Sequence, residues 1–168
     1  EGRSVRALSD VTLSLRPGEV VAVLGRTGSG KSTLLSCVAG YEAPTKGTVS
    51  VDGQVLGELK KKALDALRRE SFGFVFQSPA LIGSLTAAEN VELPSLISRH
   101  PLPEGRVGEV LDALGIGDLA GAVPAELSPG QRKLVACARA LAGRPALVLA
   151  DEPVAGLGPE EAEGVLRA

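Results

Sequence analysis

The stretch Gly25-Arg26-Thr27-Gly28-Ser29-Gly30-Lys31-Ser32-Thr33 decides the fold of this chain. Two glycines bracket four residues and are followed by Lys-Ser, which is the phosphate-loop pattern. Glycines let the backbone turn tightly, so that N–H groups point at phosphate oxygens, and the next helix adds the partial positive charge of its N-terminus. Lys31 supplies a mobile charge to the outer phosphates, and the Ser32 hydroxyl suits a magnesium shell. The pattern therefore predicts binding of a nucleoside triphosphate.

The residues on either side of this loop supply the context that the pattern needs. Residues 20–24 (VVAVL) form a short apolar run that predicts a buried parallel strand. Residues 32–39 predict a helix that Gly40 stops. The alternative is a Gly-rich turn that binds nothing, but such a turn needs neither three glycines at these offsets nor the Lys-Ser pair.

Composition restricts the class of protein. The chain has 168 residues, which is one domain or most of one and is enough to bury a core. A net charge of -2, three Phe and one Tyr argue against a nucleic-acid partner. No stretch approaches the ~18 consecutive apolar residues of a membrane span. Cys37 and Cys137 are predicted to be buried apolar residues rather than a disulfide, as in a reducing cytoplasm.

The rest of the chain alternates predicted strands and helices. Further strands are predicted at residues 11–15, 48–51, 72–76 and 146–150. Helices are predicted at residues 59–70, from 86 towards 96, up to about 115, at 131–141, and from 158 onwards. The sequence thus predicts an α/β fold, with a P-loop NTPase core on a parallel sheet, a small antiparallel β layer and an α-helical insertion.

Two acidic residues end the predicted strand at residues 146–150. Downstream of a phosphate loop, such a pair completes a nucleotide-hydrolase site, because Asp151 can hold magnesium and Glu152 can orient the attacking water. The segment Leu127-Ser128-Pro129-Gly130-Gln131 by itself predicts an ordinary capped helix. Taken with the phosphate loop, Gln77 and the acidic pair, it makes the chain resemble the nucleotide-binding domain of ATP-binding cassette (ABC) transporters over nearly all of its length.

The resemblance implies a role for each motif. The Walker A residues that bind ATP are Gly25, Arg26, Thr27, Gly28, Ser29, Gly30, Lys31, Ser32 and Thr33. The signature residues that bind the ATP of a second domain are Ser128, Gly130 and Gln131. The implied Mg²⁺ ligands are Ser32, Gln77 and the Walker B residue Asp151, and the implied catalytic residues are Glu152 as base, Lys31 and Gln77.

The resemblance also implies partners. Two such domains pair head to tail, so we expect a homodimer, together with a separate transmembrane permease subunit that docks near residues 77–82 and on the helical insertion. Residues 72–77, 85–94 and 150–153 look like the lipoprotein-releasing and macrolide-export branch of bacterial cassette ATPases. This branch implies an ATP-hydrolysing exporter subunit in the cytoplasm, peripheral at the inner face of the membrane.

The sequence departs from the family pattern at several positions. Pro129 replaces a signature glycine, which the first helical turn tolerates, and Gly158 replaces an aspartate in the loop after Glu152. The switch histidine and the adenine-stacking aromatic fall outside the chain, and His100 is expected on an exposed loop. We therefore expect one incomplete domain, residues 1–168, with a helical subdomain at about 86–141, that binds Mg-ATP weakly and hydrolyses it poorly.

Two other functions compete with transport. A degenerate regulatory nucleotide-binding module is suggested by the altered loop at residues 154–158, but intact Lys31, Gln77, Asp151 and Glu152 oppose it. A soluble cassette ATPase that acts on DNA or ribosomes is the other alternative. No heptad repeat lies between Lys31 and Ser128, which disfavours the coiled-coil members of that group.

Overall fold

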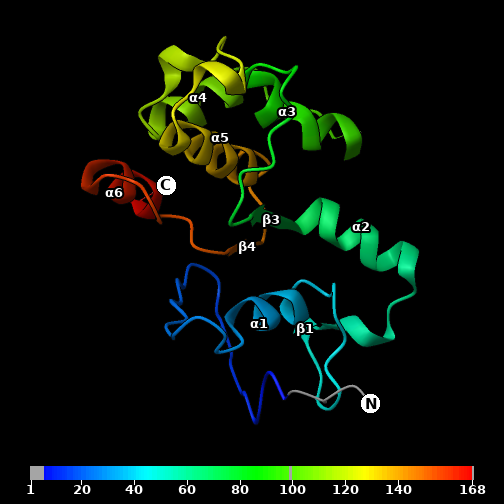
Figure 1. Cartoon of the computed structure of the whole chain (residues 1–168). Helices are drawn as coiled ribbons and strands as arrows, with labels where there is room; N and C mark the ends of the chain where they lie inside the picture. Colours follow the sequence, from blue (N-terminus) through cyan, green and yellow to red (C-terminus); the bar gives the residue numbers. More distant parts are fainter. Residues whose placement is uncertain (1–5, 99, 168) are drawn as a thin grey trace. The chain divides into compact units, whose positions relative to one another are not determined.

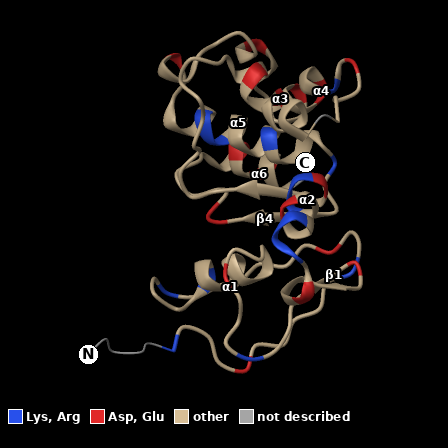
Figure 2. Cartoon of the chain, turned by 90° about the vertical axis from the view of Figure 1, so that its right-hand side faces the viewer, with Lys and Arg blue, Asp and Glu red and all other residues tan. Residues whose placement is uncertain are grey.

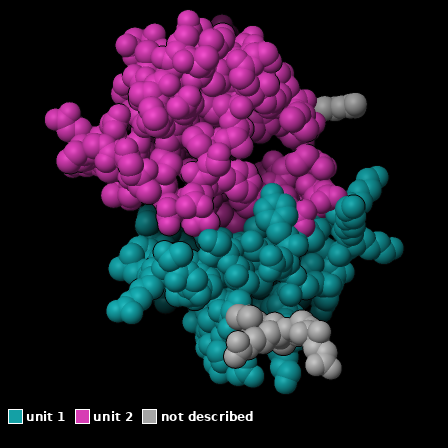
Figure 3. Space-filling view, viewed as in Figure 1, with its two compact units in different colours: residues 1–64 teal, residues 65–168 magenta. Residues whose placement is uncertain are grey.

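The computed structural model describes residues 6–98 and 100–167. Two compact units divide the chain, at residues 1–64 and 65–168 (Figure 3). The phosphate loop belongs to the first unit, and the other predicted site residues belong to the second. Among the described residues, no helix combines the length and the hydropathy that crossing a bilayer requires.

Helix α1 (Lys31–Val38) and a small antiparallel sheet lie in the first unit. Helix α1 follows the phosphate loop, as predicted (Figure 1). Strands β1 (Ser50–Val51) and β2 (Gln54–Val55) pair in antiparallel fashion, and the 3-10 helix η1 (Leu56–Glu58) follows. The two turn residues, Asp52 and Gly53, have φ values of 48° and 75°, which match the hairpin turn that the right-handed strand twist favours. The expected antiparallel β layer is therefore confirmed.

Two predicted strands of the first unit are wrong. Residues 11–15 and 20–24 form no strand, and all of them are exposed, with Val20 at 88% and Leu24 at 90%. Within the described ranges, β1 pairs only with β2 and β3 only with β4, so neither segment has a ladder partner. An alternating or continuous apolar pattern supplies suitable side chains, but a strand exists only where a neighbouring strand accepts its backbone hydrogen bonds.

A parallel strand pair forms the sheet of the second unit. Helix α2 (Lys61–Ser71), whose basic turns are blue in Figure 2, leads into β3 (Phe72–Val75). Strand β4 (Leu147–Ala150) lies parallel to β3, with Val75 opposite Ala150. The strands predicted at residues 72–76 and 146–150 are confirmed, and both of their carboxyl ends lie at the same edge of the sheet.

Helices pack around α5 in the second unit. The elements are α3 (Ala87–Ser98), α4 (Arg106–Ala113), η2 (Gly117–Leu119), η3 (Pro124–Glu126), α5 (Pro129–Ala142) and α6 (Pro159–Arg167). Helix α5 contacts α3, α4, β3 and α6, and its Leu134 and Val135 are buried in one apolar cluster with Val91 and Leu111. The predicted capping box at the start of α3 is present, since Thr86 N donates to Glu89 Oε2 at 2.7 Å and Glu89 N donates to Thr86 Oγ1 at 3.2 Å.

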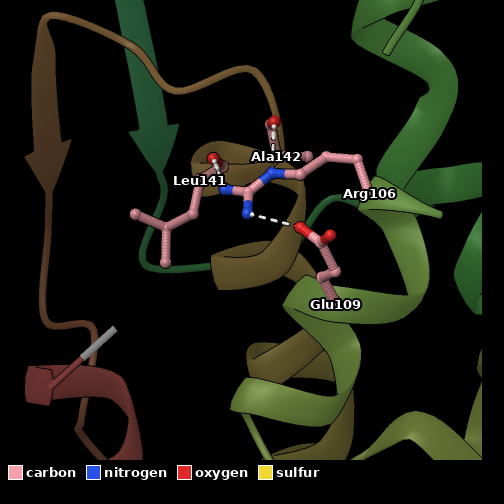
Figure 4. Close-up of polar contacts among 4 residues, drawn as sticks. All are labelled: Arg106, Glu109, Leu141 and Ala142. Carbon is pink, nitrogen blue, oxygen red and sulfur yellow. Dashed lines mark hydrogen bonds and ion pairs between the residues drawn. The ribbon is translucent and has the colours of Figure 1, made fainter. Parts of the chain in front are cut away.

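Arg106 fixes the carboxyl end of α5 (Figure 4). Its Nε donates to the carbonyl oxygen of Ala142 at 3.1 Å, and its Nη2 donates to that of Leu141 at 3.3 Å. The last carbonyls of a helix have no partner within the helix. The guanidinium adds a donor for Ala142 O and a further one for Leu141 O, which also accepts from the backbone N–H of Arg144 at 3.0 Å. Glu109 accepts from Nη1 at 3.3 Å and orients the guanidinium.

Candidate functional site

The phosphate loop has a backbone that only glycine adopts readily. Gly28 and Gly30 have φ values of 79° and 91°, in the left-handed region. A Cβ atom at Gly30 would overlap the carbonyl oxygen of Ala7, so this position also lacks room for a side chain. Ser29 N donates to Arg26 O at 3.1 Å and closes the turn between the glycines. With no side chains at these glycines, the backbone of the loop can lie close to a bound ligand.

Lys31 folds back over this loop. Its Nζ donates to Gly25 O at 2.8 Å and to Arg26 O at 3.0 Å. Lys31 is also the first residue of α1, whose N-cap Gly30 provides no side-chain hydrogen bond to the first turn. Helix N–H groups and an ammonium thus converge on one turn, which is the arrangement that binds phosphate groups.

A second group of predicted site residues, in the second unit, lies where β3 and β4 end. Asp151 N donates to Val75 O at 2.8 Å, which extends the ladder by one residue beyond the strands. Gln77, two residues after β3, donates from Nε2 to Glu152 Oε2 at 3.3 Å. The structure therefore brings together Gln77, Asp151 and Glu152, three residues that were predicted from motifs far apart in the sequence.

The backbone of Glu152 is unusual. Its φ is 52°, which is uncommon for a residue with a side chain. Ala155 N donates to Glu152 O at 3.2 Å, so residues 152–155 form a tight turn. Lys133 of α5 donates from Nζ to Glu152 O at 2.7 Å and to Ala155 O at 2.9 Å. Sequence reasoning missed Lys133, because a lysine on the first turns of a helix carries no signal that it is buried.

A second, partly buried cation holds the turn after Gln77. Arg139, also on α5, donates to the carbonyl oxygens of Pro79 at 2.7 Å and Ala80 at 2.9 Å. Ala80 has a φ of 45°, so this turn also contains a left-handed residue with a side chain. Burial lowers the pKa of Arg139. One helix therefore fixes both of the turns that carry Gln77 and Glu152.

The signature segment forms the capped start of α5. Ser128 Oγ accepts from Gln131 N at 3.1 Å, Gln131 Oε1 accepts from Ser128 N at 2.8 Å, and Pro129 is the first helical residue, as expected. A Cβ atom at Gly130 would lie 3.3 Å from Glu161 Oε1, so glycine lets α6 approach closely. The Ser128 hydroxyl lies at an exposed helix N-terminus, where an anion is stabilised.

The predicted magnesium ligands all carry oxygen donors. The Ser32 hydroxyl, the Gln77 amide oxygen and the Asp151 carboxylate are hard donors of the kind that Mg²⁺ prefers. In the part of the chain that the structure describes, no group of three or more His, Cys, Asp or Glu could hold a metal ion. A donor set with so few carboxylates suits an ion whose other ligands are water and substrate phosphates.

Other sequence expectations can be compared with the structure. His100 is exposed, as expected for the connector before α4. Cys37 and Cys137 are both buried and free, and burial raises the pKa of each thiol. These residues lie outside the candidate site.

Known proteins share this sequence and fold. The sequence profile described as ABC transporter matches residues 8–155. The chain is 46% identical over 164 residues to the lipoprotein-releasing system ATP-binding protein LolD of Pseudomonas fluorescens, covering 96% of this chain and 72% of that protein. It is 42% identical over 162 residues to the methionine import ATP-binding protein MetN of Mesorhizobium japonicum, covering 95% of this chain and 44% of that protein.

A solved structure matches as well. It is the dimeric, post-hydrolysis state of an ATP-binding cassette bound to ADP and Pi, with a TM-score of 0.86 and 38% identity, over 96% of this chain and 72% of that one. Fold, motif order and relatives agree, so the P-loop NTPase fold is confirmed. The chain belongs to the ABC transporter family and is an ATP-binding, ATP-hydrolysing component of a membrane transporter.

Proposed function

We propose that residues 25–33 bind Mg-ATP and that Glu152 is the general base for its hydrolysis. ATP hydrolysis would power transport through an export-type membrane partner. The observation that carries the site assignment is the contact of Gln77 Nε2 with Glu152 Oε2 at 3.3 Å, directly beyond two parallel strands. Strands and turns that fix two such polar side chains at one sheet edge are typical of nucleotide hydrolases.

Each residue has a separate task in this proposal. The loop amides and Lys31 bind and orient the phosphates, because several donors converge there. Ser32, Gln77 and Asp151 would hold Mg²⁺, which when bound neutralises charge on the phosphates. Glu152 accepts a proton from the attacking water, and its hydrogen bond to Gln77 fixes the direction of the carboxylate.

A second copy of the chain completes the site. Ser128, Gly130 and Gln131 present a capped helix N-terminus, and the exposed Ser128 hydroxyl suits contact with a phosphate that another copy binds. The similar cassette that was solved as a dimer with ADP and Pi supports this homodimer. Hydrolysis is therefore expected to rise steeply with protein concentration.

Apolar side chains on the second unit suit a membrane partner. Ile82, Leu96 and Ile97 are 43%, 60% and 65% exposed, on the loop before α3 and near its end. Exposed groups of large apolar residues mark protein interaction sites. We assign this region to a transmembrane permease subunit and propose that the chain works at the cytoplasmic face of the membrane. The 46% identity to the lipoprotein-releasing protein LolD supports an export-type partner.

Calorimetry and phosphate release test the site assignment. We expect Lys31→Ala to lose most of the affinity for Mg-ATP, and Glu152→Gln to keep that affinity but to release little phosphate. Lys62→Ala, at an exposed position of α2, is the matched control and should behave like the wild type. Equal phosphate release by Glu152→Gln and the wild type would contradict the role of Glu152. If both bind ATP and neither hydrolyses it, the regulatory module suggested by residues 154–158 is favoured instead.

A further inference from the structure

We propose that Lys133 is a positioning residue that locks the turn carrying Glu152 to helix α5. The inference rests on the proposed function, since it concerns the placement of the proposed general base. Lys133 is 7% exposed, and its ammonium donates to Glu152 O at 2.7 Å and to Ala155 O at 2.9 Å. It thus joins the first and last residues of the turn to one point on α5.

Burying an ammonium is costly, which argues that this contact has a use. Two backbone carbonyl oxygens accept from Lys133, rather than a carboxylate that would neutralise its charge. Simple packing at this position would be served better by an apolar side chain of similar length. The ammonium instead donates to two carbonyl groups of the turn and stabilises the conformation of that turn.

The turn needs such support because its backbone is unfavourable. Glu152 has a φ of 52°, and the next residue is Pro153, which restricts the residue before it to extended conformations. The left-handed backbone at Glu152 is therefore disfavoured by its own Cβ and by its neighbour. The hydrogen bonds to Lys133 stabilise this conformation at its carbonyl, while Gln77 holds the carboxylate.

The position of Lys133 also connects two parts of the site. Helix α5 begins at Pro129, directly after Ser128, and Lys133 lies on its first turns. A displacement of the helix start, where the phosphate of the second copy is proposed to bind, therefore moves the ammonium and with it the turn of Glu152. Lys133 thus couples the signature segment to the general base through a single side chain.

Two measurements on the full chain test this role. Lys133→Met removes the donors, Lys133→Arg keeps them, and Lys62→Met is the same substitution at an exposed site. For Lys133→Met we expect kcat to fall by about 10- to 100-fold, as for a displaced catalytic group. The KM for ATP should stay within about 2-fold, because the phosphate loop is unchanged. Amide hydrogen exchange should accelerate at residues 152–157 and not in α4.

The outcomes separate positioning from simple packing. Lys133→Arg should stay closer to the wild type than Lys133→Met in both kcat and exchange. The inference is overturned if Lys133→Met keeps its kcat, or if exchange accelerates equally throughout α4, which indicates a loss of folding rather than of placement. If the wild-type chain shows no ATP turnover, the proposed function fails. Even then, slower amide exchange at residues 152–157 in the wild type than in Lys133→Met would support the role of Lys133 in holding the turn. Equal exchange in the two proteins would refute it.

Discussion

Arg139 donates from Nη2 to the carbonyl oxygen of Pro79 at 2.7 Å, across 60 residues of sequence. A second bond, from Nη1 to Ala80 O at 2.9 Å, makes the contact a fork that spans two successive carbonyls. Because Gln77 lies between β3 and Pro79, two residues from each, these hydrogen bonds hold the backbone directly after Gln77. The guanidinium is planar and presents several donors in fixed directions, which a lysine ammonium does not reproduce.

Replacing Arg139 is therefore expected to destabilise the second unit. Arg139→Met should lower the free energy of unfolding by about 2–3 kcal/mol, since two charge-assisted hydrogen bonds are lost and two carbonyls lose their partner. Arg139→Lys should be more stable than Arg139→Met but less stable than the wild type. Urea denaturation of both variants measures the effect, with Arg69→Met, at an exposed position of α2, as the control. Equal stability of Arg139→Met and the control would show that the fork contributes nothing.

The sequence predicted those elements whose signal is local. The capping box of Thr86 and Glu89, and the cap of Ser128 with Pro129, mark the starts of α3 and α5, because a cap satisfies the first N–H groups of its own helix. The phosphate loop is likewise defined by residues that follow one another. Gln77, Asp151 and Glu152 were found through motif order, and the pairing of β3 with β4 brings them together.

The sequence failed where a residue's role depends on distant partners. Residues 20–24 have the composition of a buried strand, yet they are exposed and lack a ladder partner within the described chain. Lys133 and Arg139 carry charges, which usually predict exposed positions, but their acceptors are carbonyls in turns that lie far away in the sequence. Such pairings exist only after the helix has packed on the sheet.

Asn90 provides another prediction. Its side chain is fully buried and hydrogen-bonds to backbone groups of the loop before α3. Its Oδ1 accepts from Ile82 N at 2.8 Å, and its Nδ2 donates to the carbonyl oxygens of Ile82, Leu85 and Thr86 at 3.1, 3.0 and 2.9 Å. In Asn90→Ala, Ile82 N and Leu85 O lose this side-chain partner, whereas Ile82 O and Thr86 O keep backbone donors. The substitution also creates a cavity.

We expect Asn90→Ala to cost about 3 kcal/mol of unfolding free energy, from the unsatisfied buried groups. Chemical denaturation measures it. Leu96→Ala, on the exposed side of the same helix, is the control and should change stability by less than about 0.5 kcal/mol. A loss below about 1 kcal/mol for Asn90→Ala would mean that water replaces the amide without penalty.

Two glycines of the second unit should respond to alanine in opposite directions. A Cβ at Gly73 of β3 would overlap the carbonyl oxygen of Ala140 in α5 and lie 2.9 Å from Pro145 Cγ. Gly108 of α4 has no heavy atom within 4 Å of such a Cβ. Gly73→Ala is expected to destabilise by about 1–3 kcal/mol through overpacking. Gly108→Ala should stabilise by up to about 1 kcal/mol, because alanine favours the helix. Thermal melts of both variants measure this, and an unchanged or higher melting temperature for Gly73→Ala would contradict the close approach of β3 to α5.

The Cys137 thiol should make stability depend on alkaline pH. Cys137 is 1% exposed, and burial raises its pKa from 9.0 to about 11, while the charge of Lys133 acts in the opposite direction. Between these two values the unfolded thiol loses its proton and the folded thiol keeps it, so the folded state binds more protons. The contribution of Cys137 to stability is therefore complete below the unfolded pKa and is lost as the pH rises towards the folded pKa.

Cys137→Ala removes this dependence. The variant should be less stable than the wild type at about pH 8, and the gap should narrow by about 2–3 kcal/mol as the pH approaches about 11, at about 1.4 kcal/mol for each pKa unit. Urea denaturation of both proteins across this range measures the gap, and taking the difference cancels the titration of other groups. A gap that stays constant with pH would show that the Cys137 thiol ionises in the folded chain as readily as in the unfolded one.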